Sequence, residues 1–270
     1  MSGPITLRLK ADPGLPVDMA GVLPEPLAAL SEGELAAVPV RLGNRPTPLG
    51  DLFRVTPGDE AHLIVEDSGR RLDKLGVGMR AGTIEAYGDV GALLGLHMRG
   101  GRIVVAGRAG DLVGAEMRGG TIAVRSDAGA FVGAPLPGSA HGMAGGAILI
   151  EGDAGARCGD RMRRGLVAVG GRAGDYAAAR MIGGTVVVGG ACGAYPGYAM
   201  RRGSLLLASS PAGAVQLFAD NGFHDLPWLR LLARHLAGLG WSGDAFPTRV
   251  RHLTGDVTAG GKGELLLAVG

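Results

Sequence analysis

A repeat marked by methionine restricts the fold of this chain more than any other feature of its sequence. Seven of the nine methionines recur at intervals of 19 residues, with one interval of 26. They are Met79, Met98, Met117, Met143, Met162, Met181 and Met200. A glycine follows each of them after three residues, and apolar residues follow after five and seven, as at Ile103 and Val105. Because such alternation is typical of a strand with one buried face, each repeat is predicted to contain a short strand.

Glycine follows the same period. Of the 51 glycines, 31 lie between residues 79 and 203, and a G-x-x-G-x-x-x-G run closes most repeats, as at Gly107, Gly110 and Gly114. Glycine at bends indicates positive φ or close approach of stacked backbones. A period of 19 residues is too short for helix-pair repeats, which need about 33 residues or more. The sequence therefore predicts an all-β fold, a β-solenoid of about seven coils stacked about 4.8 Å apart.

The solenoid is expected to span residues 61–208, with residues 61–78 as a degenerate first coil and a seven-residue insertion at 136–142. Residues 1–60 lack the repeat and are predicted to form an N-terminal extension. Ser31 and Glu34 have the spacing of a capping box, which predicts a short helix. The segment from Arg41 to Phe53 is predicted to be extended.

Residues 209–270 are predicted to contain a helix from about Pro227 to Ala237 that caps the solenoid, followed by a strand-forming tail that packs on it. The position six residues after each methionine faces outward and is mostly apolar. It holds Glu85, Val104, Ala123, Leu149, Ala168, Val187 and Leu206. Contiguous exposed apolar surface is typical of an interface, so this row is predicted to contact a partner.

Composition narrows the class of protein. Apolar residues make up 46% of the chain, which argues against disorder, and a net charge of +2 argues against a dedicated nucleic-acid binder. No run of 18 apolar residues and no signal peptide is present, so no membrane association is expected. Two cysteines cannot form a disulfide framework, which favours a reducing compartment. We therefore expect a cytoplasmic protein.

The sequence offers little for catalysis or metal binding. The six histidines have no metal-ligand spacing, and Cys158 and Cys192 occupy different positions in their repeats, so both are expected to be buried as small apolar residues. The glycine runs lack the strand-to-helix context of a phosphate loop. His141, within the insertion, is the best catalytic candidate but has no evident partner to orient it. Contact with a partner protein or a neutral surface loop are the alternatives for His141. No catalytic residue and no metal site are assigned.

One row of like charges is the remaining candidate site. Five arginines occupy the position directly after a repeat methionine: Arg80, Arg99, Arg118, Arg163 and Arg201. Stacked cations repel one another, so this row is predicted to attract an anionic partner. The alternative is that flexible arginine side chains simply extend into water.

The repeats resemble the right-handed β-helix at the C-terminus of the glutamate synthase large subunit and the C subunit of formylmethanofuran dehydrogenase. The segments RLGNRPTPLGDLF (41–53) and GDVTAGGKGELLL (255–267), with a leucine-rich helix before the second, look like the pattern of the C subunit. Arginine- and alanine-rich composition points to the bacterial methylotroph branch, the C subunit of the formyltransferase/hydrolase complex. The resemblance implies a single-stranded right-handed β-helix.

The resemblance also implies a non-catalytic scaffold that assembles with the A, B and D subunits of the same complex. Such a complex moves a formyl group from formyl-tetrahydromethanopterin to a methanofuran-type carrier and releases formate, as a step of formaldehyde oxidation in one-carbon metabolism. Zinc is expected in the hydrolase subunit, and no cofactor is expected on this chain. Because methanofuran-type carriers have a glutamate-containing chain, the five arginines are candidate contacts for the carrier arm.

Two alternatives remain open at this point. The chain also resembles the C subunit of a molybdenum or tungsten formylmethanofuran dehydrogenase, whose metal would be bound by another subunit. A stand-alone acyltransferase on a left-handed hexapeptide helix needs an 18-residue period, and the 19-residue repeat argues against it.

Overall fold

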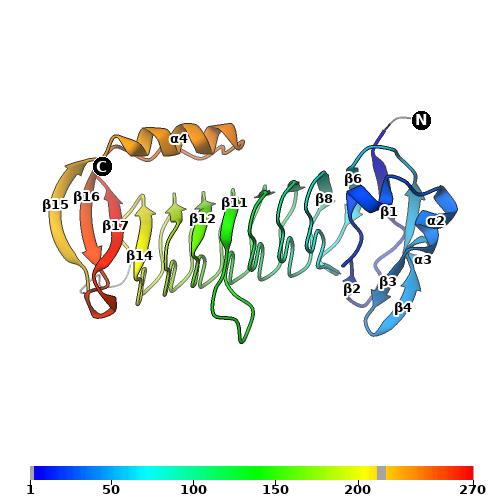
Figure 1. Cartoon of the computed structure of the whole chain (residues 1–270), viewed down its shortest axis with the longest axis horizontal. Coiled ribbons are helices and arrows are strands. Elements are labelled where there is room, and N and C mark those ends of the chain that lie inside the picture. Colours follow the sequence, from blue (N-terminus) through cyan, green and yellow to red (C-terminus); the bar gives the residue numbers. More distant parts are fainter. Residues whose placement is uncertain (1–2, 212–216, 270) are drawn as a thin grey trace.

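A computed structural model describes residues 3–211 and 217–269, so residues 212–216 of the predicted C-terminal segment lie outside it. Most of the regular structure is β-strand. The centre is a row of seven strands that run in the same direction, shown side by side in Figure 1. They are β8 (Thr83–Gly88), β9 (Arg102–Val105), β10 (Thr121–Val124), β11 (Ala144–Ile150), β12 (Arg164–Val169), β13 (Thr185–Val188) and β14 (Arg202–Leu207).

These strands pair in chain order with the predicted 19-residue offset. Ile103 lies opposite Ile84 on one side and Ile122 on the other, while the insertion makes the next offset 26 residues, from Ile122 to Ile148. A second row of single bridges joins the coils away from the strands, for example Ala109 to Ala128. The predicted strand in each repeat is confirmed, and the observed offset does not match the 18-residue coil of a hexapeptide helix.

The repeat methionines form the inner spine of the stack. All seven are buried, together with the residues five and seven positions after them. The glycine three positions after a methionine has positive φ, for example 89° at Gly120. A Cβ at Gly120 would lie 2.7 Å from Cε of Met98 in the preceding coil and 2.8 Å from the carbonyl oxygen of Gly101. Methionine and glycine recur together because the methyl group of one coil occupies the space that a side chain would need in the next.

The N-terminal end extends the stack and then closes it. Strand β6 (His62–Ser68) is the degenerate coil, because it pairs with β8 at an offset of 21 residues rather than 19. Strand β1 (Ile5–Leu9) pairs in parallel with β6 and antiparallel with β5 (Phe53–Thr56). A separate four-stranded sheet flanks this end. It contains β2 (Val17–Asp18), β3 (Pro39–Leu42), β4 (Arg45–Pro48) and β7 (Leu72–Asp73).

Short helices pack between these N-terminal strands: α1 (Pro24–Leu27), α2 (Glu32–Ala37) and α3 (Leu49–Leu52). The predicted capping box begins α2, since the Ser31 backbone N–H donates to Glu34 at 2.9 Å. The prediction that Arg41 to Phe53 is entirely extended is wrong over α3. There Leu49 is buried, and Gly50 lies so close to Ala36 that a Cβ would be 2.8 Å from that of Ala36. Tight packing against α2 therefore favours a helical turn.

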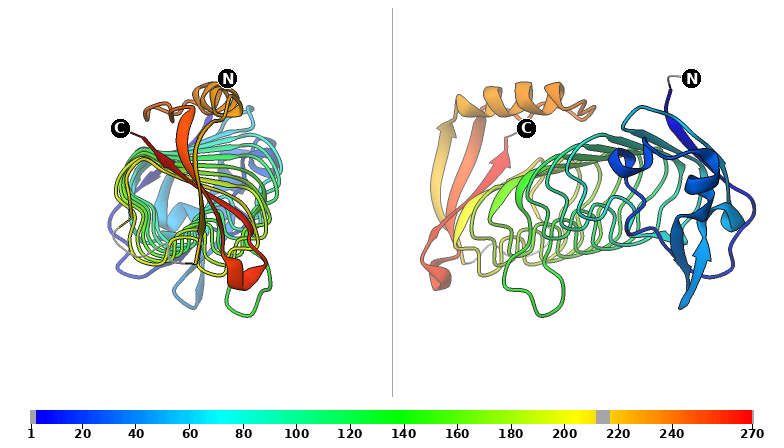
Figure 2. Two further views of the ribbon diagram at one scale, coloured as in Figure 1. Left: turned by 90° about the vertical axis from the view of Figure 1, so that its left-hand side faces the viewer. Right: turned by 45° about the vertical axis from the view of Figure 1, so that its right-hand side comes forward.

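The opposite end is covered by strands and not by a helix. Strand β17 (Lys262–Ala268) pairs in parallel with β14, then β16 (Arg249–Gly255) and β15 (Ala219–Asp225) follow as antiparallel neighbours. A 3-10 turn, η1 (Val257–Ala259), joins β16 to β17. Figure 2 shows these strands crossing the open end of the stack.

Helix α4 (Trp228–Gly238) runs along the side of the stack, as Figures 1 and 2 show. Its Leu229 and Leu236 pack with Leu149, Val187 and Leu206 of the outward row. The helix thus packs against the solenoid as predicted, but it lies along the side of the stack and not over its end. The prediction that the apolar row contacts a partner protein is wrong for the residues that the helix covers. The outward apolar row attracts a helix of the same chain, because covering it removes apolar surface from water. None of the described helices is long and apolar enough to cross a membrane.

Substitution of two glycines that share one backbone conformation tests the methionine–glycine packing. Gly120 and Gly138 have φ of 89° and 88°, but a Cβ at Gly138 would meet nothing within 4 Å. We expect Gly138→Ala to lower the free energy of unfolding by about 1 kcal/mol, the ordinary cost of this conformation. Gly120→Ala should cost about 2 kcal/mol more, because its methyl group collides with Met98 and the Gly101 carbonyl. Urea unfolding measures both, and equal losses would contradict the packing described.

Candidate functional site: the arginine face and the insertion loop

The five predicted arginines form a row with two gaps along one face of the stack. The backbone N–H of Arg99 donates to the Met79 carbonyl and that of Arg118 to the Met98 carbonyl, both at 2.8 Å, and Arg163 and Arg201 bond in the same way to the coils before them. All five side chains are exposed. Among the described residues, none of these guanidinium groups has an ion-pair or hydrogen-bond partner. The row is broken where Ala144 and Ile182 take the equivalent positions.

The insertion lies beside this row. It leaves the stack after Ala134 and returns at Gly142, and Figure 1 shows it projecting on the side opposite α4. The Leu136 N–H donates to Oε1 of Glu116 at 3.1 Å, and Nη1 of Arg161 donates to the Ser139 carbonyl at 3.0 Å. Residues of the coils on both sides thus hold the loop against the stack.

Two hollows flank the loop, and His141 lines both. One of about 890 Å³ is also lined by Arg161, Arg180 and Arg201, and the other, of about 510 Å³, by Glu116, Arg118 and Arg163. The structure therefore brings three of the five predicted arginines together with His141. Arg80 and Arg99 lie farther along the row and line neither hollow.

Arg161 and Arg180, which line the larger hollow, are not among the site residues predicted from the sequence. Both directly precede a repeat methionine, and like the residues that follow the methionines they point out of the stack. Nε of Arg180 donates to Asp160 at 2.9 Å, and Nη2 contacts the other carboxylate oxygen. Only 2% of the Asp160 surface is exposed. The repeat gives a sequence signal for these positions. The residue directly before a repeat methionine is polar in four coils, as His97, Glu116, Arg161 and Arg180.

The hollows have the character of an anion site, since cationic side chains outnumber acidic ones around them. The hollows do not have the character of a catalytic site. In the part of the chain that the structure describes, no carboxylate or hydroxyl group hydrogen-bonds to the ring of His141. No group of three or more potential metal ligands occurs within residues 3–211 and 217–269.

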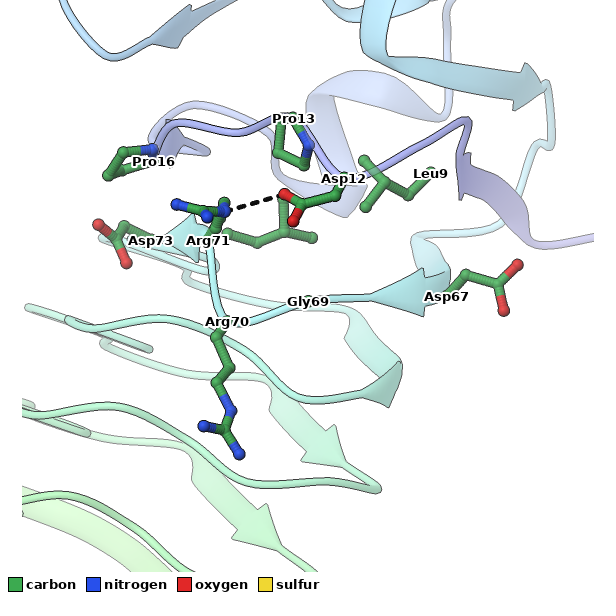
Figure 3. A pocket seen from close by; sticks show the side chains of 10 residues that line it. Leu9, Asp12, Pro13, Pro16, Asp67, Gly69, Arg70, Arg71 and Asp73 are labelled. Carbon is green, nitrogen blue, oxygen red and sulfur yellow. Dashed lines mark hydrogen bonds and ion pairs between the residues drawn. The ribbon is translucent and has the colours of Figure 1, made fainter.

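A third hollow, of about 650 Å³, lies at the N-terminal end and contains none of the predicted site residues. In Figure 3 the Asp12 carboxylate points toward Arg71, whose Nε donates to it at 2.9 Å, while Arg70 points away. The Gly14 N–H and Arg71 lower the pKa of Asp12. Arg70 binds Asp89 at 2.8 Å. The first ion pair joins the N-terminal segment to the degenerate coil, and the second joins that coil to the next, so a structural role accounts for both.

The two cysteines are buried inside the stack at different positions of their coils, as predicted, and both are free thiols. Burial raises the pKa of Cys158 to about 12 and that of Cys192 to about 11. A thiol with such a pKa stays protonated near neutrality and is neither a nucleophile nor a ready metal ligand.

Comparison with known proteins identifies the family. No family model matches the sequence. Over 89 residues the chain is 40% identical to the C subunit of the formyltransferase/hydrolase complex Fhc of Methylorubrum extorquens, covering 33% of this chain and 34% of that protein. A chain in the crystal structure of the formyltransferase/hydrolase complex (FhcABCD) of the same organism, in complex with methylofuran, aligns over its full length, with 98% of this chain covered, 39% identity and a TM-score of 0.90. This chain belongs to the family of Fhc C subunits.

A second curated relative is more distant. The C subunit of the tungsten-containing formylmethanofuran dehydrogenase 2 of Methanococcus maripaludis is 28% identical over 89 residues, 32% of this chain and 33% of that protein. The chain thus spans about a third of the length of each curated relative in these sequence matches. The likeness over the full length comes from the solved structure.

The two buried thiols make the stability of the protein depend on pH in the alkaline range. Their pKa values are raised in the folded state, so the stabilisation is complete below the ordinary thiol pKa of 9.0 and is lost as pH rises toward 11 and 12. We expect the free energy of unfolding to fall above pH 9 by up to about 1.4 kcal/mol per pH unit for each thiol. The free energy of unfolding is measured by denaturant titration from pH 8 to 10.5. In a Cys158→Ala/Cys192→Ala variant it should fall much less steeply with pH than in the wild-type chain. Alanine is the matched replacement, because Ala177 and Ala173 occupy the equivalent positions in neighbouring coils. Identical slopes in both proteins would contradict the burial.

Proposed function

We propose that this chain is the non-catalytic scaffold of a multi-subunit formyltransferase/hydrolase complex and assembles with its A, B and D subunits in the cytoplasm. The observation that carries the proposal is the match to a chain of FhcABCD over the full length at 39% identity. The isolated position of His141 and the raised thiol pKa values support a role without catalysis. Identity to the formyltransferase/hydrolase relative is 40%, against 28% for the tungsten dehydrogenase relative, which favours the first class.

In this proposal the complex moves a formyl group from formyl-tetrahydromethanopterin to a methanofuran-type carrier and releases formate, and the hydrolase subunit holds zinc. The methylofuran in the solved relative supports a carrier of this type. We also propose that the stack is a single-stranded right-handed β-helix over residues 61–208, between an extension of residues 1–60 and a C-terminal segment of residues 209–270. Parallel pairing at 19-residue offsets supports it.

The test of the scaffold role compares the chain alone with the complete assembly from its native host. We expect formyl transfer and hydrolysis only in the assembly, with this chain co-purifying in fixed ratio. Activity of a stable, monomeric chain without partners would contradict the proposal. Metal analysis of the same assembly separates the two classes of complex, because molybdenum or tungsten at one atom per complex would indicate a dehydrogenase.

We further propose that the arginine row contacts the anionic arm of the carrier. Its support is the set of five exposed arginines, whose coils follow one another at about 5 Å or its multiples. A carboxylate chain running along the stack could exchange partners from one arginine to the next without leaving the row. The two hollows beside the insertion loop would then be the most cationic part of its path.

Arginine-to-glutamine changes test this contact. We expect Arg99→Gln/Arg118→Gln to slow formyl transfer in the assembled complex about 3- to 10-fold at low salt, with little difference at high salt, because screening removes the attraction. Arg230→Gln/Arg234→Gln is the matched control, since both residues are exposed on α4 and the charge change is the same. Unchanged turnover of the Arg99/Arg118 variant at low salt, in an intact complex, would show that the row does not contact the carrier.

A further inference from the structure

A second row of side chains, distinct from the arginine row, changes character along the stack. It occupies the position 14 residues after each of the first six repeat methionines and holds Leu93, Leu112, Phe131, Arg157, Tyr176 and Tyr195. All six have positive φ, between 57° and 64°. Because this conformation recurs in every coil, it belongs to the geometry of the bend, and the bend turns each of these side chains outward. Of these six coils, only the last three have arginine or tyrosine at this position.

Tyr176, Tyr195 and Tyr198 form a stacked aromatic cluster at this bend. The rings of Tyr176 and Tyr195 stack at 5.1 Å with an interplanar angle of 20°, and Tyr198 meets Tyr176 edge-on at 5.9 Å. The guanidinium carbon of Arg157 lies 4.9 Å from the centre of the Tyr176 ring. Tyr195 and Tyr198 nevertheless remain 56% and 48% exposed, so stacking orders these rings but leaves much of their surface in water.

Asp160 joins this cluster to the hollow beside the insertion loop. It binds Arg180 through both carboxylate oxygens and lies 3.6 Å from Nη1 of Arg157. The equivalent position in the first three coils holds Leu96, Ala115 and Ala134, all buried. Burying a carboxylate there costs desolvation energy and does not improve the core. Its effect is to hold two guanidinium groups at the surface in fixed positions.

Arg157, Tyr176, Arg180, Tyr195 and Tyr198 thus form one connected, ordered surface, which we name the tyrosine–arginine patch. A purely structural stack would need neither a buried carboxylate nor two half-exposed rings. Tyrosine and arginine are the residues that contribute most binding energy at protein interfaces. Side chains that are already ordered also lose less entropy when a partner binds.

The charge around the patch indicates the chemistry of the partner. The neighbouring hollow contributes Arg161, Arg201 and His141, and none of the described residues that line it carries a carboxylate. Of the two carboxylates at the patch, Asp160 is buried beneath its arginines, and Asp175 is exposed but accepts a backbone hydrogen bond at 2.8 Å, so cationic groups remain in excess. The surface therefore complements a segment that carries carboxylates together with apolar or aromatic side chains.

We propose that the tyrosine–arginine patch is the docking surface for an acidic segment of another subunit in the same complex. This inference rests on the proposed function, because it requires that the chain assembles with partner subunits. Helix α4 already covers much of the outer face of the strands and lies on the side away from the insertion loop, which leaves the patch and the loop for the partner.

Tyrosine variants in the full-length chain test the proposal. Tyr195→Asn/Tyr198→Ala removes both exposed rings, and asparagine tolerates the positive φ at position 195. Tyr87→Ala is the matched control, since Tyr87 is 53% exposed near the other end of the stack and contacts Glu85. Binding of each chain to the remaining subunits, expressed together, is measured by titration at low and high salt. Thermal unfolding of each variant confirms that it folds.

We expect the double variant to bind the other subunits at least about 30-fold more weakly, as a loss at an interface hot spot would. The Tyr87 control should change binding less than about 3-fold. Equal affinities of the double variant and the wild-type chain would overturn the proposal. The proposal would also be overturned if the double variant only converted a dimer of this chain into a monomer. The patch would then bind a second copy of this chain and not another subunit. If the wild-type chain binds no partner subunits, the proposed function itself fails, which is a separate outcome.

Discussion

The contact between a methionine methyl group and a glycine of the next coil is the interaction on which this structure depends. Met98 against Gly120 is one example, and the same contact recurs between coils from Met79 to Gly203. The glycine must lack a side chain, and the methionine must be long and flexible enough to reach it. Between the coils from Met79 to Gly203, this contact lets the backbones approach to strand-pairing distance and keeps methionine and glycine at the same place in every coil, including across the 26-residue offset.

Regular stacking converts each sequence position into a row of side chains along the molecule. A single residue type at the surface then becomes a line of equivalent groups, as with the exposed arginines that follow the methionines. We infer that binding sites lie where such a row is interrupted or where the residue type in the row changes. The insertion at 136–142, the buried Asp160 and the stacked tyrosines all lie in the C-terminal half of the stack, so the surface of this half differs from that of the coils before it.

Periodicity predicted the strands, their offset and their buried face, because each depends on contacts between equivalent residues of adjacent coils. It could not place α4, whose leucines predict an amphipathic helix but do not tell which apolar surface they cover. The outward row of Leu149, Val187 and Leu206 was wrongly interpreted as an interface for the same reason. Asp160 and Arg180 were missed because their pairing joins neighbouring coils and depends on the direction of each side chain.

The most direct test is a cryo-EM map of the complex purified from its native host. We predict that Tyr195, Tyr198 and the insertion loop lie against another subunit, with its carboxylates beside Arg157 or Arg180, and that α4 still covers its own strands. A map in which the tyrosine–arginine patch faces solvent, while the chain contacts its partners through other surfaces, would contradict this prediction.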